Sequence, residues 1–300
     1  MAEREEWLGR VGAIRQWSRA GERAPHKPLL LLYAFGRLQR TGKSEASYLE
    51  AEPTLGQLLA DYGPPRQSSP AYPFHHLQSD GLWVVTAKGG DPGASPTRLR
   101  DSGAVGSLAP DLESVLREDP ALLALASRLL LDDNFPETLH ADLCVAAGLD
   151  LDALEVAAVQ RRVAQLRRRD PGFRERVLVA YEYRCAMCGF DGRLSTEAVG
   201  LDAAHVRWWA FDGPDTVENA LCLCVFHHKL LDRGVLGLGS DCTVSVSARF
   251  VGRGRAAEEM VLRLVGSPLL EPQPGQPRPD DVHVTWHGDQ VFRGPARVPA

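Results

Sequence analysis

The sequence predicts an α+β protein of two domains, a mainly α-helical N-terminal domain and a C-terminal domain rich in cysteine and histidine. Three observations support this. Apolar residues recur at helical spacing through most of the first 150 residues. An arginine-rich amphipathic segment then separates the two halves. Five of the six cysteines follow it, between residues 185 and 242, a clustering that in a reducing compartment is typical of metal binding.

The N-terminal half is predicted to be mostly helical. Apolar spacing or density predicts helices over residues 4–19, 29–40, 54–63, 120–131 and 136–149. Pro28 fits the first turn of the second helix, and prolines also open the last two. Residues 63–81 (GPPRQSSPAYPFHHLQSDG) predict a long Pro/Ser-rich loop before a short buried strand, GLWVV. Residues 87–98 predict a further loop because glycine and proline are frequent there.

Domain boundaries follow from the helical connector. Residues 1–148 form the first predicted domain, residues 149–172 the linker helix and residues 173–300 the second domain. Alternating apolar residues in this last part predict three strands, at residues 243–250, 260–265 and 282–287.

Composition and charge restrict the functional classes. The chain is 44% hydrophobic with a net charge of −5, and it has neither an apolar leader nor a run of about 20 apolar residues as in a membrane span. We therefore expect a soluble, cytoplasmic protein with no membrane partner. Basic residues are concentrated in residues 1–40 and 161–176, on either side of an acidic stretch. Two basic patches suit two contacts with DNA in one chain, although solvated helix faces have the same pattern.

The cysteine spacing predicts a structural zinc site. Cys185 and Cys188 form a CxxC half-site, and Cys224 and His227 repeat the two-residue gap. Together they give the four ligands of a tetrahedral Cys3His site for Zn²⁺. A pairing that uses Cys222 and Cys224 is the open alternative, but its one-residue gap is less common.

A second site is indicated by the histidine that follows His227. Neighbouring residues on a helix point about 100° apart, so His228 is free for a different role. His205, in an expected short strand, and Asn219, just before the second zinc half-site, complete the order CxxC, His, Asn, CxxHH.

Residues 181–236, which carry these motifs, resemble HNH endonucleases of the ββα-metal type. The resemblance implies that His205 is the general base, that Asn219 braces the loop holding it, and that His228 helps bind a catalytic divalent cation such as Mg²⁺ or Mn²⁺. A neutral imidazole can accept a proton near pH 7, which suits this role. Many HNH enzymes have an acidic metal ligand directly before the first histidine, where this chain has Ala204. Asp202 is the nearest acid, and strand alternation puts it on the face opposite His205.

The N-terminal half, through GERAPHKPLLLLYAFGRL and SSPAYPFHHLQSDGLWVV, resembles the sulfur-binding domain of phosphorothioate-dependent, McrA-like restriction enzymes. This implies binding to double-stranded DNA in which sulfur replaces a non-bridging phosphate oxygen. An apolar pocket would accept sulfur by dispersion and disfavour oxygen by desolvation. The candidate DNA- and sulfur-binding residues are Arg23, His26, Lys27, Arg66, Ser68, Tyr72, Pro73, Phe74, His75 and His76.

The sequence thus favours a restriction endonuclease that reads phosphorothioated DNA and hydrolyses the backbone nearby. A homodimer is expected, because cutting both strands needs two active sites. Two alternatives stay open: an HNH nuclease that reads another modification such as methylcytosine, and a non-catalytic zinc-containing DNA-binding regulator.

Overall fold

The computed structural model describes residues 2–15, 22, 24–66, 68–150, 170–239 and 241–298. The chain divides into two compact units, residues 1–165 and 166–300. Most of the expected linker helix, and Trp17 and Arg23, lie outside the described residues. Within the described part, no helix is both long and apolar enough to cross a bilayer.

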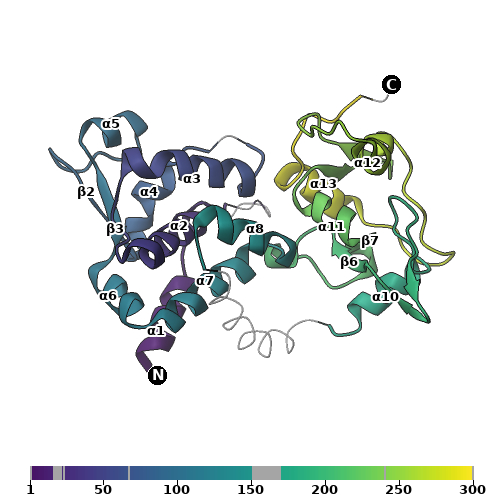
Figure 1. The fold of residues 1–300 in the computed structure, drawn as a ribbon, viewed down its shortest axis with the longest axis horizontal. Helices are drawn as coiled ribbons and strands as arrows, with labels where there is room; N and C mark the ends of the chain where they lie inside the picture. Colours follow the sequence, from purple (N-terminus) through teal and green to yellow (C-terminus); the bar gives the residue numbers. More distant parts are fainter. Residues whose placement is uncertain are drawn as a thin grey trace. The chain divides into compact units, whose positions relative to one another are not determined.

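Helices dominate the N-terminal unit (Figure 1). Its helices and 3-10 turn are α1 (Ala2–Gly12), α2 (His26–Thr41), α3 (Tyr48–Tyr62), α4 (Ala71–His76), η1 (Leu77–Asp80), α5 (Pro96–Asp101), α6 (Pro110–Glu118), α7 (Pro120–Asn134) and α8 (Glu137–Ala147). The predicted helices therefore all appear in the described residues. The unit also has a three-stranded antiparallel sheet in the order β1-β3-β2, made of β1 (Ala46–Ser47), β2 (Trp83–Thr86) and β3 (Val105–Leu108).

Helix α2 is the central element of this unit and contacts α3, α4, α7 and α8. Its apolar run is buried, as its composition predicts, and it ends at Gly42, which adopts the left-handed conformation. Gly36 allows α8 to approach closely, because a Cβ atom there would lie 2.1 Å from the carbonyl oxygen of Ala147. The predicted strand GLWVV is confirmed as β2, whereas β1, β3 and α6 are elements that the sequence did not reveal.

The prediction of a continuous loop over residues 63–81 is wrong. Residues 71–80 form α4 and η1. Pro70 is the residue before α4, where the missing N–H of proline is tolerated, and Phe74 is fully buried in edge-to-face contact with Tyr48 and Trp83. The indole Nε1 of Trp83 donates a hydrogen bond to the carbonyl oxygen of Phe74 (2.9 Å). Burial of one aromatic side chain thus stabilises a helix in a segment that reads as a loop. Residues 87–95 are irregular as expected, but α5 begins at Pro96.

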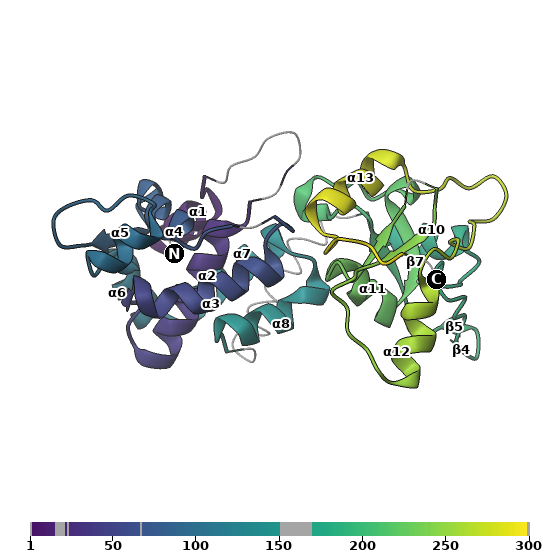
Figure 2. The same cartoon turned by 90° about the horizontal axis from the view of Figure 1, so that it is seen from above.

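The C-terminal unit is built on a hairpin followed by a helix. Strands β6 (Leu201–His205) and β7 (Ala220–Cys224) pair antiparallel, with His205 opposite Ala220, and α11 (Val225–Asp232) follows directly. Helix α10 (Phe173–Ala180) also packs on both strands (Figures 1 and 2). This ββα arrangement confirms the predicted fold class. The remaining elements are β4 (Arg193–Leu194), β5 (Glu197–Ala198), η2 (Trp209–Phe211), η3 (Val217–Asn219), β8 (Leu236–Leu238), β9 (Val244–Val246), α12 (Arg255–Met260), η4 (Leu262–Leu264) and α13 (Asp281–Gln290).

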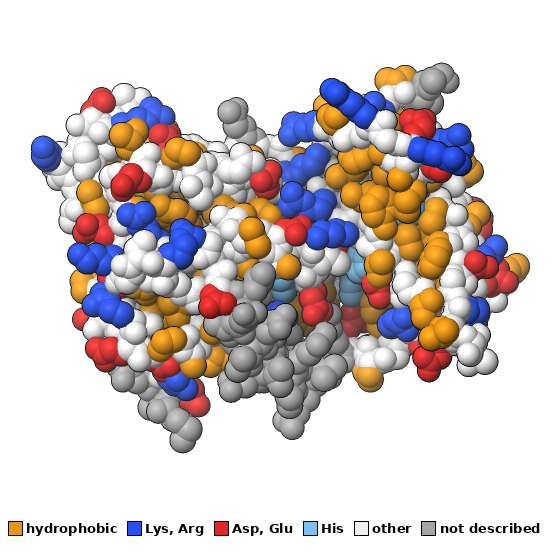
Figure 3. All heavy atoms as spheres, viewed as in Figure 1, with side chains coloured by type: hydrophobic (Ala, Val, Ile, Leu, Met, Phe, Trp, Pro, Cys, Tyr) orange, Lys and Arg blue, Asp and Glu red, His pale blue; other side chains and the backbone are white. Residues whose placement is uncertain are grey.

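Two of the three predicted C-terminal strands are wrong. Residues 243–250 do contain β9, paired with β8. Residues 282–287 lie instead in α13, where the buried residues His283, Trp286, His287 and Gln290 recur at helical rather than alternating spacing. Residues 260–265 form the end of α12 and the 3-10 turn η4. One face of this unit also exposes a group of hydrophobic side chains (Figure 3).

Candidate metal centre and nuclease site

The CxxC segment forms a tight turn after α10. The backbone N–H of Gly189 donates to the carbonyl oxygen of Cys185 (2.8 Å), and the N–H of Cys185 donates to that of Phe190 (2.9 Å). Gly189 has a φ of +74°, which glycine adopts without steric cost. This turn directs both thiols of the half-site toward one point.

Four ligand atoms converge where this turn meets the start of α11. The sulfur atoms of Cys185, Cys188 and Cys224 and a ring nitrogen of His227 all lie within 4.8 Å of one another. Cys185, Cys224 and His227 are buried, whereas Cys188 is exposed. A hydrogen bond with Cys188, followed by one with Cys224, lowers the pKa of Cys185 and so favours its thiolate. The four residues that the spacing singled out therefore form one Cys3His cluster.

The ring of His227 is oriented for this cluster by its second nitrogen. Nδ1 lies 3.5 Å from the sulfur of Cys185 and 3.3 Å from that of Cys224. Nε2 lies 2.8 Å from the carbonyl oxygen of Met260, to which only a protonated nitrogen can donate. Donation from Nε2 leaves the lone pair of Nδ1 directed at the sulfur atoms, as in a metal-ligating histidine.

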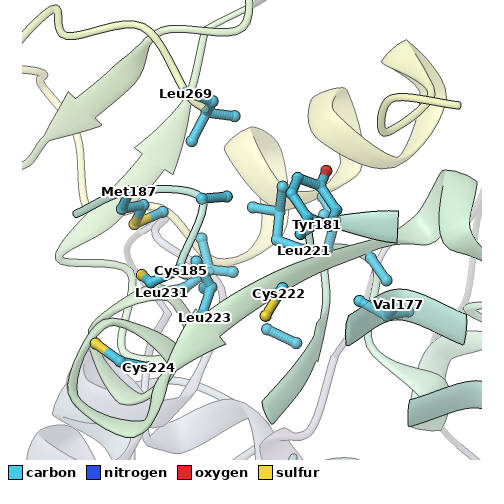
Figure 4. Packing of buried hydrophobic residues seen from close by; sticks show 14 of the residues in the cluster. Val177, Tyr181, Cys185, Met187, Leu221, Cys222, Leu223, Cys224, Leu231 and Leu269 are labelled. Carbon is cyan, nitrogen blue, oxygen red and sulfur yellow. The ribbon is translucent and has the colours of Figure 1, made fainter. Parts of the chain in front are cut away.

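Cys222, the rival ligand, lies within the apolar core rather than in the cluster. It is fully buried in the hydrophobic core around β7 (Figure 4). Burial raises its pKa to about 12, so the thiol is protonated at neutral pH.

His205 is held between an aromatic ring and a carboxylate at the end of β6. Its ring stacks on Phe173 of α10 with centroids 4.5 Å apart. Its Nε2 lies 2.8 Å from Oδ1 of Asp215. The other carboxylate oxygen of Asp215 accepts a hydrogen bond from the backbone N–H of Asp170 (3.0 Å). A ring that donates from Nε2 to Asp215 keeps the lone pair of Nδ1 for accepting a proton.

Asn219 is buried and closes the loop that follows His205. Its side-chain oxygen accepts from the N–H of Arg207 (2.8 Å), and its amide nitrogen donates to the carbonyl oxygens of Arg207 (2.9 Å) and Pro214 (3.0 Å). These three bonds fix residues 207–214 next to the strand that carries His205.

His228 lies on α11 with a carboxylate near each ring nitrogen. Nε2 is 3.3 Å from Oδ2 of Asp232, one turn later on the helix, and Nδ1 is 3.6 Å from Oδ2 of Asp202 on β6. Nδ1 is buried and has no hydrogen-bond partner. Burial alone would lower the pKa of His228, but the charges of Asp232 and Asp202 outweigh it, so the pKa is raised. The interaction with His228 lowers the pKa of Asp202.

In the N-terminal unit, several of the expected DNA-binding residues gather around Tyr72. The ring of Tyr72 lies 6.2 Å from that of His26 and 4.4 Å from that of His76, measured between centroids. Ser68 Oγ lies 3.0 Å from Nε2 of His26. The ring of His75 contacts that of His76, whose pKa is lowered chiefly by burial. This group is called the Tyr72 cluster: His26, Ser68, Tyr72, His75 and His76.

Tyr72 is exposed, but its two neighbours are not. Pro73 and Phe74 are buried, and Phe74 has no exposed surface. This corrects the expectation that Phe74 lines a pocket: its ring packs into the core and anchors α4, so that Tyr72 is presented to solvent.

The basic candidates differ in their surroundings. Lys27 is buried, and its ammonium lies 2.6 Å from the carboxylate of Asp80, which also accepts from the backbone N–H of Arg15 (3.0 Å). Arg66 is half exposed and pairs with Glu22 (2.9 Å). Lys27 therefore has a structural partner, whereas Arg66 lies at the surface.

Sequence reasoning missed Asp215, Asp232 and Phe173 in this site. Asp215 lies ten residues after His205 in the segment FDGPDTVEN, and no local spacing rule relates the two. The i,i+4 spacing of His228 and Asp232 is a helical pairing that the sequence does carry.

The geometry of the C-terminal unit defines a ββα nuclease domain stapled by a Cys3His cluster. Comparison with protein families agrees. Residues 185–239 match the HNH endonuclease family, and residues 4–152 match the ScoMcrA-like DNA sulfur-binding domain. The chain thus belongs to the proteins in which a ScoMcrA-like DNA sulfur-binding domain precedes an HNH endonuclease domain.

Solved structures similar to the N-terminal half include two sulfur-binding domains complexed with phosphorothioated DNA. That of SprMcrA has 26% identity and a TM-score of 0.42, and the match covers 49% of this chain and 94% of that one. That of ScoMcrA has 28% identity and a TM-score of 0.43, with 49% and 98% covered. No curated protein matches the chain.

Proposed function

We propose that the protein is a modification-dependent restriction endonuclease that binds phosphorothioated DNA through its N-terminal unit and hydrolyses the backbone with its C-terminal unit. The observation that carries this proposal is the combination, in one chain, of a DNA sulfur-binding domain with an HNH domain whose histidines are positioned by buried polar contacts.

In the proposed reaction, His205 accepts the proton of a water molecule as its oxygen attacks the scissile phosphorus. The phosphorus–oxygen bond on the opposite side breaks, leaving a phosphate and a hydroxyl end. Asp215 orients the imidazole and stabilises its charged form, since Nε2 lies 2.8 Å from the carboxylate. Asn219 keeps the adjoining loop in place through its three hydrogen bonds to backbone groups.

His228 is proposed as a ligand of the catalytic divalent cation. The residues fit this role, because the buried Nδ1 has no hydrogen-bond partner within the described residues and an aspartate lies nearby. A divalent cation such as Mg²⁺ or Mn²⁺ would offset the charge that develops on the phosphate oxygens.

The Cys3His cluster is proposed to hold structural Zn²⁺. Three thiol sulfurs and one imidazole nitrogen form the donor set that tetrahedral zinc prefers, and the donors converge. The short strands around the cluster are two or three residues long, so the ion would supply cross-links that the hydrophobic core does not.

Sulfur recognition is proposed at the Tyr72 cluster. Tyr72 and His76 present ring faces, and the lowered pKa of His76 keeps that ring uncharged at neutral pH. Such a surface makes dispersion contacts with a soft sulfur atom and solvates a charged oxygen poorly. Arg66 is proposed to grip the neighbouring phosphate, as is Arg23, which lies outside the described residues. A homodimer would supply the second active site for the opposite strand.

The test is cleavage of two plasmids of one sequence, one phosphorothioated and one plain, with and without Mg²⁺ or Mn²⁺. We expect the protein to cut only the modified plasmid and only with a divalent cation. Cutting of methylcytosine-containing DNA instead would show a reader of another modification. Tight binding without cutting in any cation would identify a non-catalytic regulator.

A further inference from the structure

An unpartnered nitrogen points to a ligand that the protein side chains alone do not supply. Nδ1 of His228 is buried and lacks a hydrogen-bond partner. A buried polar atom in this condition loses its interaction with water without compensation, which is why such atoms are rare in native proteins. A bound cation removes the cost, because the lone pair of Nδ1 then has an acceptor.

The second nitrogen of the same ring has a partner suited to fix its proton. Oδ2 of Asp232 lies 3.3 Å from Nε2, and the side chain of Asp232 is only 2% exposed. A buried carboxylate favours a proton on the nitrogen that faces it, and in metal sites such a carboxylate sets the tautomer of the ligating histidine. Asp232 therefore directs the lone pair of His228 to Nδ1.

The carboxylate of Asp202 lies on the Nδ1 side. Its Oδ2 is 3.6 Å from Nδ1, beyond the range of a good hydrogen bond. Two ligand atoms each about 2.1 Å from one octahedral cation are roughly 3 Å apart, so a small side-chain adjustment would bring both onto the same ion. The side chain of Asp202 is 43% exposed, which leaves the site open to solvent and to a phosphate.

Ala204 has no donor atom, and it faces the same side of β6 as Asp202 because side chains alternate along a strand. Helix α11, which carries His228, packs on β6. The acid two residues before Ala204 is therefore the one that this strand offers to the helix.

We propose that Asp202 and His228 together bind the catalytic divalent cation, and that Asp232 is a positioning residue which makes Nδ1 the ligating atom. Oxygen and imidazole donors suit Mg²⁺ or Mn²⁺, whereas the thiol-rich cluster suits zinc. This inference rests on the proposed nuclease function and names the ligands of that site.

The test is Mn²⁺ binding to the full-length, zinc-loaded protein, followed by the electron paramagnetic resonance signal of free Mn²⁺. His228→Ala defines the binding that belongs to this site. We expect Asp202→Asn to lose that binding, and Asp232→Asn to weaken it by about 10–100-fold. Asp289→Asn, a change at an exposed aspartate of α13 in the same unit, is the matched control and should bind like the wild type.

Zinc content and the unfolding transition of each variant show whether it is folded. Asp202 is partly exposed, so Asp202→Asn is expected to fold even if the buried Asp232 is less tolerant. Wild-type binding in Asp202→Asn, or equal binding in the wild type and His228→Ala, would overturn the inference.

The plasmid assay separates this inference from the proposed function. A wild type that cuts modified DNA while Asp202→Asn keeps its Mn²⁺ leaves the nuclease standing and refutes the ligand assignment. Loss of Mn²⁺ from Asp202→Asn in a protein that cuts no DNA supports the metal site and refutes the proposed function.

Discussion

His227 and His228 are consecutive residues of α11, but their rings face different surroundings. The Nδ1 atom of His227 faces the sulfurs of Cys185 and Cys224, and Nε2 meets a backbone carbonyl. The Nδ1 atom of His228 faces Asp202, and Nε2 meets the carboxylate of Asp232. In both residues, one nitrogen has a partner that sets the tautomer and the other faces donor groups.

The comparison teaches how one helix turn can serve two sites. Successive side chains on a helix point about 100° apart, so one ring reaches the thiols and the next reaches the carboxylates. Thiols select zinc, whereas carboxylates suit harder cations, so each site can favour its own ion. We therefore expect the two histidines to respond differently to substitution.

The largest effect should come from breaking the cysteine cluster. Cys188→Ser should lose zinc and unfold the C-terminal unit, because structural zinc contributes about 10–16 kcal/mol in zinc-finger peptides. Metal analysis and circular dichroism measure both effects. Cys222→Ser is the matched control and should keep zinc, since Cys222 lies in the core. Loss of zinc from Cys222→Ser with its retention in His227→Ala would show the other pairing.

Removing the proposed base should affect rate alone. His205→Ala should slow cleavage by about 10²–10⁴-fold, the typical contribution of a positioned base. Zinc content and affinity for modified DNA should not change. Single-turnover cleavage measures the rate, and an unchanged rate would remove His205 from the mechanism.

Substitution of the carboxylate that faces His205 should have a smaller effect. Asp215→Asn keeps the size of the side chain but removes its charge, so the ring is held less well and the rate should fall about tenfold or more. Asp212→Asn, an exposed change in the same loop, is the control and should cut like the wild type. Equal rates for the two variants would show that Asp215 does not assist the base.

The smallest effect is expected in the sulfur-binding unit. Tyr72→Ala should weaken binding to phosphorothioated DNA by about 1–2 kcal/mol, on the order of tenfold in Kd, and should change binding to plain DNA much less. Arg66→Ala should weaken both and reduce the salt dependence of each, because it removes a phosphate contact. Titration of duplexes that differ in one sulfur atom tests this. Equal losses for both duplexes in Tyr72→Ala would place sulfur recognition elsewhere.

The parts of the site that the sequence predicted are those fixed by local spacing. The CxxC and CxxH gaps determine which side chains share a turn, so the Cys3His cluster follows from them. The adjacency of His227 and His228 likewise predicts two directions. The contact between His205 and Asp215 depends on a loop path set by Asn219, and no pattern in the sequence encodes it.

The errors in the fold have the same origin. VHVTWH alternates like a strand, but Trp286 and His287 are buried together on one face of α13. SPAYPFHH has the composition of a loop, but burial of Phe74 against Trp83 stabilises a helix there. In both segments tertiary packing outweighs local preference.

The most direct test of the account is binding and cleavage by the wild type and His228→Ala on matched duplexes with and without one phosphorothioate, in Mn²⁺. We predict that both proteins bind the sulfur-containing duplex more tightly than the plain one, that both keep their zinc, and that only the wild type cuts. Equal binding of the two duplexes by the wild type, or cutting of the modified duplex by His228→Ala, would contradict the account.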